Sequence, residues 1–115
     1  QLHLPGAIPP GEMVDWYQKA RVVVVPSRRE GFGMVAAEAS ACGRAVVAAE
    51  VGAMSQIVEH RVSGLLIETE NVEALSAALT SVDPDWGSEG PQRVVEFGID
   101  AHGQQVRQLC EDLLN

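Results

Sequence analysis

The sequence predicts an α/β fold: a Rossmann-like open parallel sheet with flanking helices. Short apolar runs occur at residues 22–25, 45–49 and 65–67, and such runs are typical of strands buried on both faces. Segments with apolar residues at helical spacing separate these runs. Strands that alternate with helices form parallel sheets through crossover connections. We therefore expect one domain over residues 1–115, with residues 83–115 forming terminal helices.

The composition indicates a globular chain and excludes several classes of partner. Hydrophobic residues make up 46% and charged residues 21% of the 115 residues. The formal net charge of -8 argues against nucleic acid or an anionic membrane as the main partner. No apolar run approaches the roughly 18 residues of a membrane helix. Cys42 and Cys110 lack metal-ligand spacing, so we expect buried thiols in a reducing, cytoplasmic compartment and no metal site.

The N-terminal segment is expected to form a strand, a helix and a second strand. Leu2 and Leu4 alternate before a Pro-Gly pair, which predicts a short strand over residues 1–5. A helix from residue 10 or 12 to about 20 follows, with one apolar face: Met13, Trp16, Tyr17 and Ala20. We expect its two aromatic side chains to pack in the core rather than to form a stacking platform. The four valines at 22–25 are then predicted to be a central, buried strand.

A glycine-containing loop follows this strand and leads into a helix. Gly31 and Gly33 permit a tight loop, and residues 33–42 predict a small-residue helix closed by Gly43. A helix that begins near Phe32 or Gly33 directs unpaired backbone N–H groups, and the positive end of its dipole, at the carboxyl edge of the sheet. This arrangement of strand, loop and helix is where α/β proteins bind anionic ligands.

The second half of the chain continues the alternation. Residues 45–49 predict a buried parallel strand, residues 54–59 a short helical turn and residues 65–67 a third strand. Asn71 is expected to cap a helix to about residue 82, with an apolar stripe made of Val72, Leu75, Ala78, Leu79 and Val82. A turn-rich connection and two further helices, at 91–97 and 100–114, complete the prediction.

Two carboxylates flank the glycine loop and are the first candidates for chemistry. A carboxylate can accept two hydroxyl protons from a polyol, so Glu30 could hold a sugar and Glu38 a ribose diol. Their spacing alone favours these roles no more than a purely structural interpretation, in which Glu30 is a loop carboxylate or a helix N-terminal charge and Glu38 is a solvated helix residue. Both interpretations stay open at this point. The side chains of Arg28 and Arg29 are expected to be solvated. The histidines form no catalytic or metal constellation in the sequence: His3, His60 and His102.

The segment PSRREGFGMVAAEASACGRAVVA resembles the nucleotide-binding segment of retaining glycosyltransferases with two Rossmann-like lobes, the GT-B fold. The resemblance is to the large group 1 family, which includes glycogen and sucrose synthases and phosphatidylinositol mannosyltransferases. That family's pattern has Pro-Ser, then Glu-Gly-Phe-Gly, a second Glu after seven intervening residues, and Ala-Cys-Gly. The flanking Leu4-Pro5-Gly6 and Gly64-Leu65-Leu66 are similar to the family pattern as well.

The resemblance implies a role for each matching residue. Glu30 would be the catalytic residue that contacts the donor sugar, and Glu38 would hold the nucleotide ribose. The sugar and diphosphate would lie against Gly31, Phe32, Gly33 and Met34. The donor would be a nucleotide-diphosphate sugar, transferred with retention and without metal or cofactor. The chain would then be a truncated C-terminal donor-binding domain that requires a preceding acceptor lobe and is inactive alone.

Two departures from the family pattern motivate a different hypothesis. Val51 and Gln56 occupy positions where the family often has Gly and Glu. A sheet that lacks part of its lobe would also expose an edge and a face. The alternative is therefore a non-catalytic Rossmann-like remnant or interaction module that self-associates into a homo-oligomer. A generic nucleotide-binding Rossmann protein is the weaker third choice, because the sequence contains no G-x-G-x-x-G.

Overall fold

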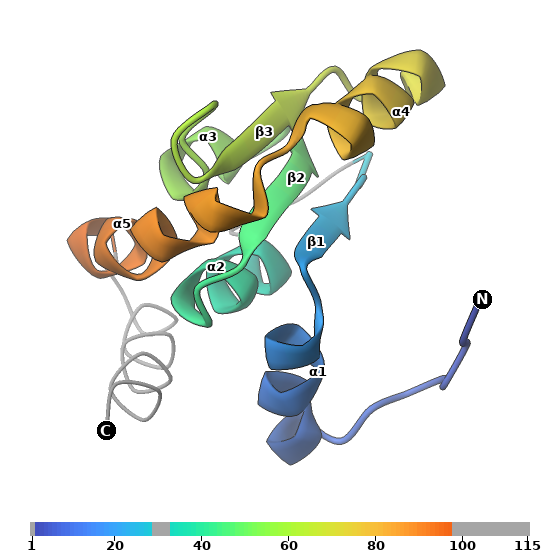
Figure 1. Ribbon diagram of the computed structural model, residues 1–115, viewed down its shortest axis with the longest axis vertical. Coiled ribbons are helices and arrows are strands. Elements are labelled where there is room, and N and C mark those ends of the chain that lie inside the picture. Colours follow the sequence, from blue (N-terminus) through green and yellow to red (C-terminus); the bar gives the residue numbers. More distant parts are fainter. Residues whose placement is uncertain (1, 29–32, 98–115) are drawn as a thin grey trace.

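The computed structural model describes residues 2–28 and 33–97, which form a three-stranded parallel sheet flanked by helices (Figure 1). The strands are β1 (Val22–Val25), β2 (Ala45–Ala49) and β3 (Gly64–Ile67), hydrogen-bonded in the order β1-β2-β3. All three run in the same direction, so their carboxyl ends meet at one edge. The prediction of a Rossmann-like α/β fold with an open parallel sheet is confirmed.

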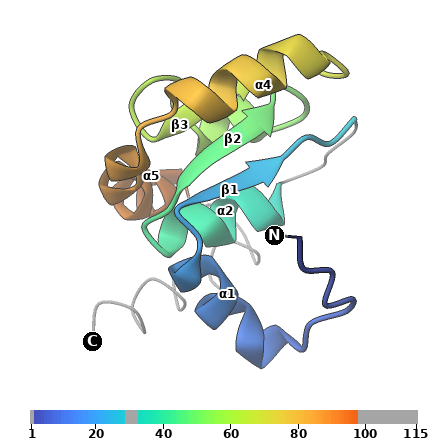
Figure 2. The same ribbon diagram turned by 45° about the vertical axis from the view of Figure 1, so that its right-hand side comes forward.

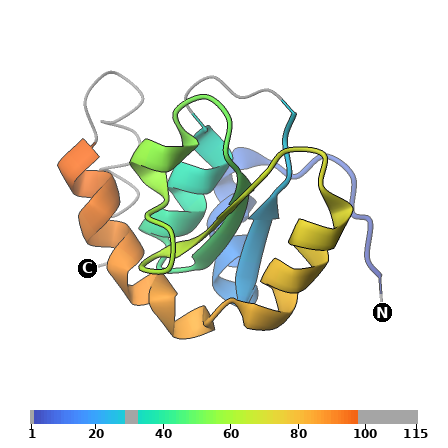
Figure 3. The same cartoon turned by 90° about the horizontal axis from the view of Figure 1, so that it is seen from above.

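The helices cover both faces of the sheet. They are η1 (Pro10–Glu12), α1 (Met13–Lys19), α2 (Met34–Ala41), α3 (Met54–Ile57), α4 (Val72–Ser81), η2 (Pro84–Glu89) and α5 (Gly90–Phe97). Figures 2 and 3 show α4 on one side of the sheet and α2 on the other, with α5 packed beside α2. The predicted helix at 100–114 lies outside the described residues.

Strand β2 is the centre of the structure, and all five of its residues are buried. Alternate side chains of a strand point to opposite faces, and the apolar core is accordingly divided in two. Val46 and Ala48 belong to the cluster on the α2 side, whereas Val47 packs with Ala78 of α4 on the other side. The buried strand predicted at 45–49 is therefore confirmed.

Helix α2 lies close to the sheet because its inner surface is made of small residues. Four alanines are no more than 3% exposed: Ala36, Ala37, Ala39 and Ala41. Gly33 precedes the helix with φ of 83°, and Gly43 follows it with φ of 76°. Both values lie in the left-handed region that glycine adopts without strain. The small-residue helix and its glycine terminator are confirmed.

Helix α4 begins as predicted, but its apolar stripe is only partly buried. The Asn71 side chain accepts a hydrogen bond of 2.9 Å from the backbone N–H of Ala74, which confirms the N-cap. Ala78 is buried, yet Val72 is 75% and Leu79 49% exposed. The helix packs against β2 and β3 through Leu75, Ala78 and Val82, and Val72 and Leu79 lie largely outside this contact.

Three predictions near the N-terminus are wrong. Residues 2–5 form no strand, because they pair with no other segment of the described sheet, and Leu2 and Leu4 are 81% and 83% exposed. Strand β1 is at an edge of the described sheet rather than central, and Val24 is 37% exposed. Trp16 is not in the core, being 43% exposed, whereas Tyr17 is buried. Adjacent residues of a helix point in directions about 100° apart, so only one of this pair faces α2.

Several features bear on the composition-based expectations. Cys42 is buried at the end of α2, and Cys110 lies outside the described residues. Within residues 2–28 and 33–97, no helix is long and apolar enough to cross a membrane. The same residues contain no group of three or more His, Cys, Asp or Glu side chains placed to hold a metal ion.

Candidate functional site

The carboxyl edge of the sheet carries the connections in which the sequence predicts a ligand site. The segments after β1, β2 and β3 all start at this edge (Figure 1). Three of the predicted site residues, Glu30, Gly31 and Phe32, lie outside the described residues, and their roles stay predictions. The structure describes the other three: Gly33, Met34 and Glu38.

Gly33 sets the point at which α2 begins. Its carbonyl oxygen accepts the first helical hydrogen bond, 2.9 Å from the N–H of Ala37. A Cβ at this position would lie 3.0 Å from Cδ1 of Ile57 and 3.2 Å from Sδ of Met54. The positive φ favours glycine here, and the close packing against α3 leaves little room for a larger residue.

The amino-terminal turn of α2 carries backbone N–H donors. The first N–H groups of a helix have no partner within it, and the N-cap residue Gly33 has no side chain that could cap them. These groups, together with the positive end of the helix dipole, favour an anion near Gly33 and Met34. The prediction that a helix starts at this loop is confirmed.

Glu38 lies one turn further along the same face of α2 as Met34, because residues four apart on a helix are neighbours. Its side chain is half-buried and is held by another helix: the phenol of Tyr17 in α1 donates a hydrogen bond of 2.9 Å to Oε2 of Glu38. Glu38 is therefore not a freely solvated helix residue. Its position is fixed beside the helix terminus that would bind an anion.

Tyr17, for which the sequence predicts only a place in the core, contacts Glu38 directly. It is 5% exposed, and its backbone carbonyl accepts a hydrogen bond of 3.0 Å from Nε of Arg44. Burial, followed by the hydrogen bond to Glu38, raises the pKa of the phenol well above its ordinary value. The phenol is therefore protonated at neutral pH and donates to the carboxylate. The helical spacing of Tyr17 predicts that its ring is buried, but it does not predict this contact.

The connections after β1 and β3 contact each other at the same edge. Nε of Arg28 lies 2.9 Å from Oε1 of Glu70, with the two side chains 82% and 59% exposed. The Thr69 hydroxyl donates to the carbonyl oxygen of Ser27 over 3.5 Å. Such exposed ion pairs contribute little to stability. The expectation that Arg28 is a solvated surface residue agrees with this exposure.

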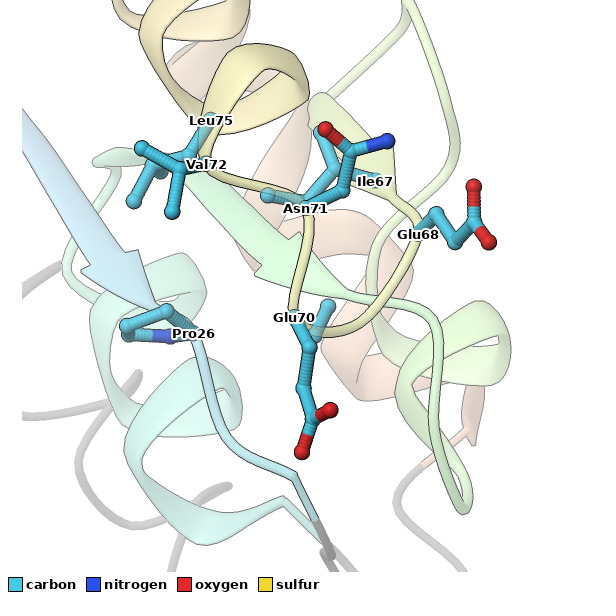
Figure 4. A pocket seen from close by; sticks show the side chains of 8 residues that line it. Pro26, Ile67, Glu68, Glu70, Asn71, Val72 and Leu75 are labelled. Carbon is cyan, nitrogen blue, oxygen red and sulfur yellow. The ribbon is translucent and has the colours of Figure 1, made fainter.

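A small cavity of about 130 Å³ opens between the end of β1 and helix α4 (Figure 4). It is lined by Pro26, Ala49, Ile67, Glu68, Glu70, Asn71, Val72 and Leu75. Figure 4 shows the carboxylates of Glu68 and Glu70 pointing away from the apolar side chains of Val72 and Leu75. Neither Met34 nor Glu38 lines this cavity, so it is distinct from the surface that α2 presents.

Comparison with known proteins identifies the family to which this arrangement is similar. Residues 1–98 match the family model described as glycosyl transferases group 1. The D-inositol 3-phosphate glycosyltransferase of Thermobispora bispora is 44% identical over 79 residues, which are 67% of this chain and 18% of that protein. The enzyme of the same name from Corynebacterium jeikeium is 36% identical over 111 residues, covering 91% of this chain and 26% of its own length.

A solved structure supports the same relationship. Sucrose-phosphate synthase from Thermosynechococcus elongatus, a GT-B enzyme, superposes with a TM-score of 0.66 at 37% sequence identity. The superposition covers 86% of this chain and 27% of the synthase. The chain thus spans about a quarter or less of the length of the proteins it matches.

Proposed function

Because the chain belongs to the group 1 glycosyl transferase family, we propose that it forms the donor-binding side of a retaining glycosyltransferase. The donor in this proposal is a nucleotide-diphosphate sugar. The strongest support is that α2 begins at the carboxyl edge of the parallel sheet after Gly33, which has no capping side chain, and that Glu38 is held on the same helix face as Met34. An anion-binding terminus and a carboxylate then lie within one turn of each other.

The proposed roles follow the parts of the donor. The diphosphate lies against the backbone N–H groups at the start of α2, near Gly33 and Met34. Glu38 accepts hydrogen bonds from the ribose hydroxyls, and Glu30 contacts the hydroxyls of the transferred sugar. Negative charge that develops on the leaving diphosphate is stabilised by the helix N–H groups and dipole, so these residues perform their part without a metal.

The acceptor is bound by other residues of the working enzyme. Several relatives are named as D-inositol 3-phosphate glycosyltransferases, which makes a phosphorylated inositol the first acceptor to test. In this proposal a second, acceptor-binding lobe completes the cleft, and residues 1–115 alone do not transfer sugar.

Replacement of Glu38 by Gln is expected to weaken the binding of nucleoside diphosphates at least about tenfold. The substitution keeps the size of the side chain but removes its charge, and hydrogen bonds to charged groups contribute about 1.5–3 kcal/mol. Calorimetric titration of the expressed protein that carries this chain, with uridine and guanosine diphosphates, measures the effect. Glu73→Gln is the matched control, because Glu73 is an exposed carboxylate in the first turn of α4. Equal affinities for the Glu38 variant and the control would contradict the ribose role.

A second candidate function is self-association. Strand β1 pairs on only one side within the described sheet, and the apolar side chains of Val24 in β1 and of Val72 and Leu79 in α4 are exposed. An unpaired strand edge beside apolar surface favours pairing with another chain. Under this hypothesis the protein forms a dimer at micromolar concentration, and Val24→Lys dissociates the dimer. Sedimentation equilibrium measures both masses. A monomer at all concentrations would exclude it.

A further inference from the structure

The hydrogen bond between α1 and α2 joins residues that are far apart in the sequence. The Tyr17 hydroxyl lies 2.9 Å from Oε2 of Glu38, and the two residues are 21 positions apart. Within the described part of the chain, Oε1 of Glu38 has no hydrogen-bond donor. One carboxylate oxygen is therefore bound by Tyr17, and among residues 2–28 and 33–97 nothing donates to the other.

We infer that Tyr17 is a positioning residue that holds Glu38 in the orientation in which Oε1 meets the ribose hydroxyls of the nucleotide. This inference rests on the proposed function, since it specifies how one carboxylate of that site becomes selective for ribose. Tyr17 does not touch the ligand. It acts through Glu38.

The anchoring of Tyr17 makes it suited to this task. The ring is buried, and Arg44 binds the Tyr17 carbonyl oxygen through Nε at 3.0 Å. Tyr17 is thus held at its backbone carbonyl by the segment that connects α2 to β2, and at its hydroxyl by α2 itself. A rigid donor at one end of the pair leaves the carboxylate few orientations.

The expected gain in nucleotide affinity comes from conformational entropy. A glutamate side chain loses up to about 2 kcal/mol of rotamer freedom when it is ordered. Where the protein has already ordered it, the ligand does not bear that cost on binding, so affinity rises without a new contact to the ligand. A site that is arranged to bind a hydroxyl group also rejects analogues that lack the hydroxyl, because its polar atoms are then left without partners.

Tyr17→Phe tests the inference, since it removes only the hydroxyl group and keeps the buried ring. The expressed protein that carries this chain is titrated calorimetrically with uridine diphosphate and guanosine diphosphate, and with their 2′-deoxy and 3′-deoxy counterparts. We expect the unsubstituted protein to prefer the ribose forms, and Tyr17→Phe to lower that preference about three- to tenfold. The affinity for the deoxy forms should change less, because each lacks one of the two hydroxyl groups that Glu38 binds.

Two controls separate positioning from general stability. Trp16→Phe alters the exposed neighbour on α1 and should leave the ribose preference unchanged. In a protein that already carries Glu38→Ala, Tyr17→Phe should have no further effect on that preference. Thermal unfolding of each variant verifies that the titrated protein is folded.

The outcomes are distinct. An unchanged ribose preference in a folded Tyr17→Phe variant would overturn the positioning role while leaving the proposed function intact. Equal weakening of ribose and deoxyribose forms would also overturn it, because that pattern indicates a purely structural role. If the unsubstituted protein binds none of these nucleotides, the proposed function itself fails, and the inference with it.

Discussion

Sugar transfer by the expressed protein that carries this chain is expected to fall at least about a hundredfold when Glu30 is replaced by Gln. In the proposed site Glu30 contacts the hydroxyls of the transferred sugar, and the loss of one group that stabilises a transition state costs about a hundred- to a thousandfold in kcat. The free energy of unfolding should change much less. Initial rates with a nucleotide-diphosphate sugar donor, measured beside urea unfolding, give both quantities.

Glu50→Gln is the matched control for this experiment. Glu50 is an exposed carboxylate that directly follows β2 at the same edge of the sheet. It therefore reports the effect of removing one negative charge from this edge without removing the predicted sugar contact. Transfer that survives Glu30→Gln, or that falls equally in the Glu50 control, would exclude the role assigned to Glu30.

Gly64→Ala is expected to destabilise the fold by about 3 kcal/mol or more. A Cβ at Gly64 would overlap the carbonyl oxygen of Val46 and lie 2.9 Å from its carbonyl carbon. These atoms are backbone of the buried central strand, which pairs with β3 at this register, so they cannot move aside without disrupting the sheet. Urea unfolding followed by circular dichroism measures the change.

Gly11→Ala is the control for the glycine substitution, because a Cβ at Gly11 would have no neighbour within 4 Å. We expect its free energy of unfolding to stay within about 0.5 kcal/mol of the parent value, as for most surface substitutions. If Gly64→Ala were as stable as this control, the close pairing of β2 and β3 at Gly64 would be wrong.

The elements that could be predicted from the sequence are those with strong local signals. The apolar run at 45–49 predicts β2. Five consecutive apolar residues are all buried in a strand when it lies between two other strands and helices cover both of its faces. The alanines of α2 and the cap at Asn71 likewise predict their helices. Each of these signals is contained within a few neighbouring residues.

The errors concern position within the sheet, which depends on what lies beside each segment. The valines of β1 have the same local pattern as a central strand, but Val24 is exposed because no described segment covers it. Leu2 and Leu4 alternate as a strand does, yet a strand needs a hydrogen-bonding neighbour and they have none in the described sheet. The periodicity of apolar residues does not show which segments lie beside a strand.

The site was predictable in its type but not in its contacts. The glycine loop and the two glutamates indicate an anion-binding helix terminus with carboxylates beside it, and this remains a prediction; the structure describes Glu38 on α2, hydrogen-bonded to Tyr17. The contact between Tyr17 and Glu38 was not predictable, because it depends on how α1 packs against α2. An aromatic residue at helical spacing predicts burial but not the partner of its hydroxyl group.

In the proposed site, the start of α2 and Glu38 bind the diphosphate and ribose of a sugar nucleotide. Nuclear magnetic resonance titration of the isotope-labelled protein with uridine and guanosine diphosphates tests both contacts at once. We predict that at least one nucleotide shifts the backbone amide signals of Met34 and Val35 and the side-chain signals of Glu38. Signals that stay unchanged there at millimolar nucleotide, or shifts confined to Asn71 and Leu75 at the apolar cavity, would contradict the claim.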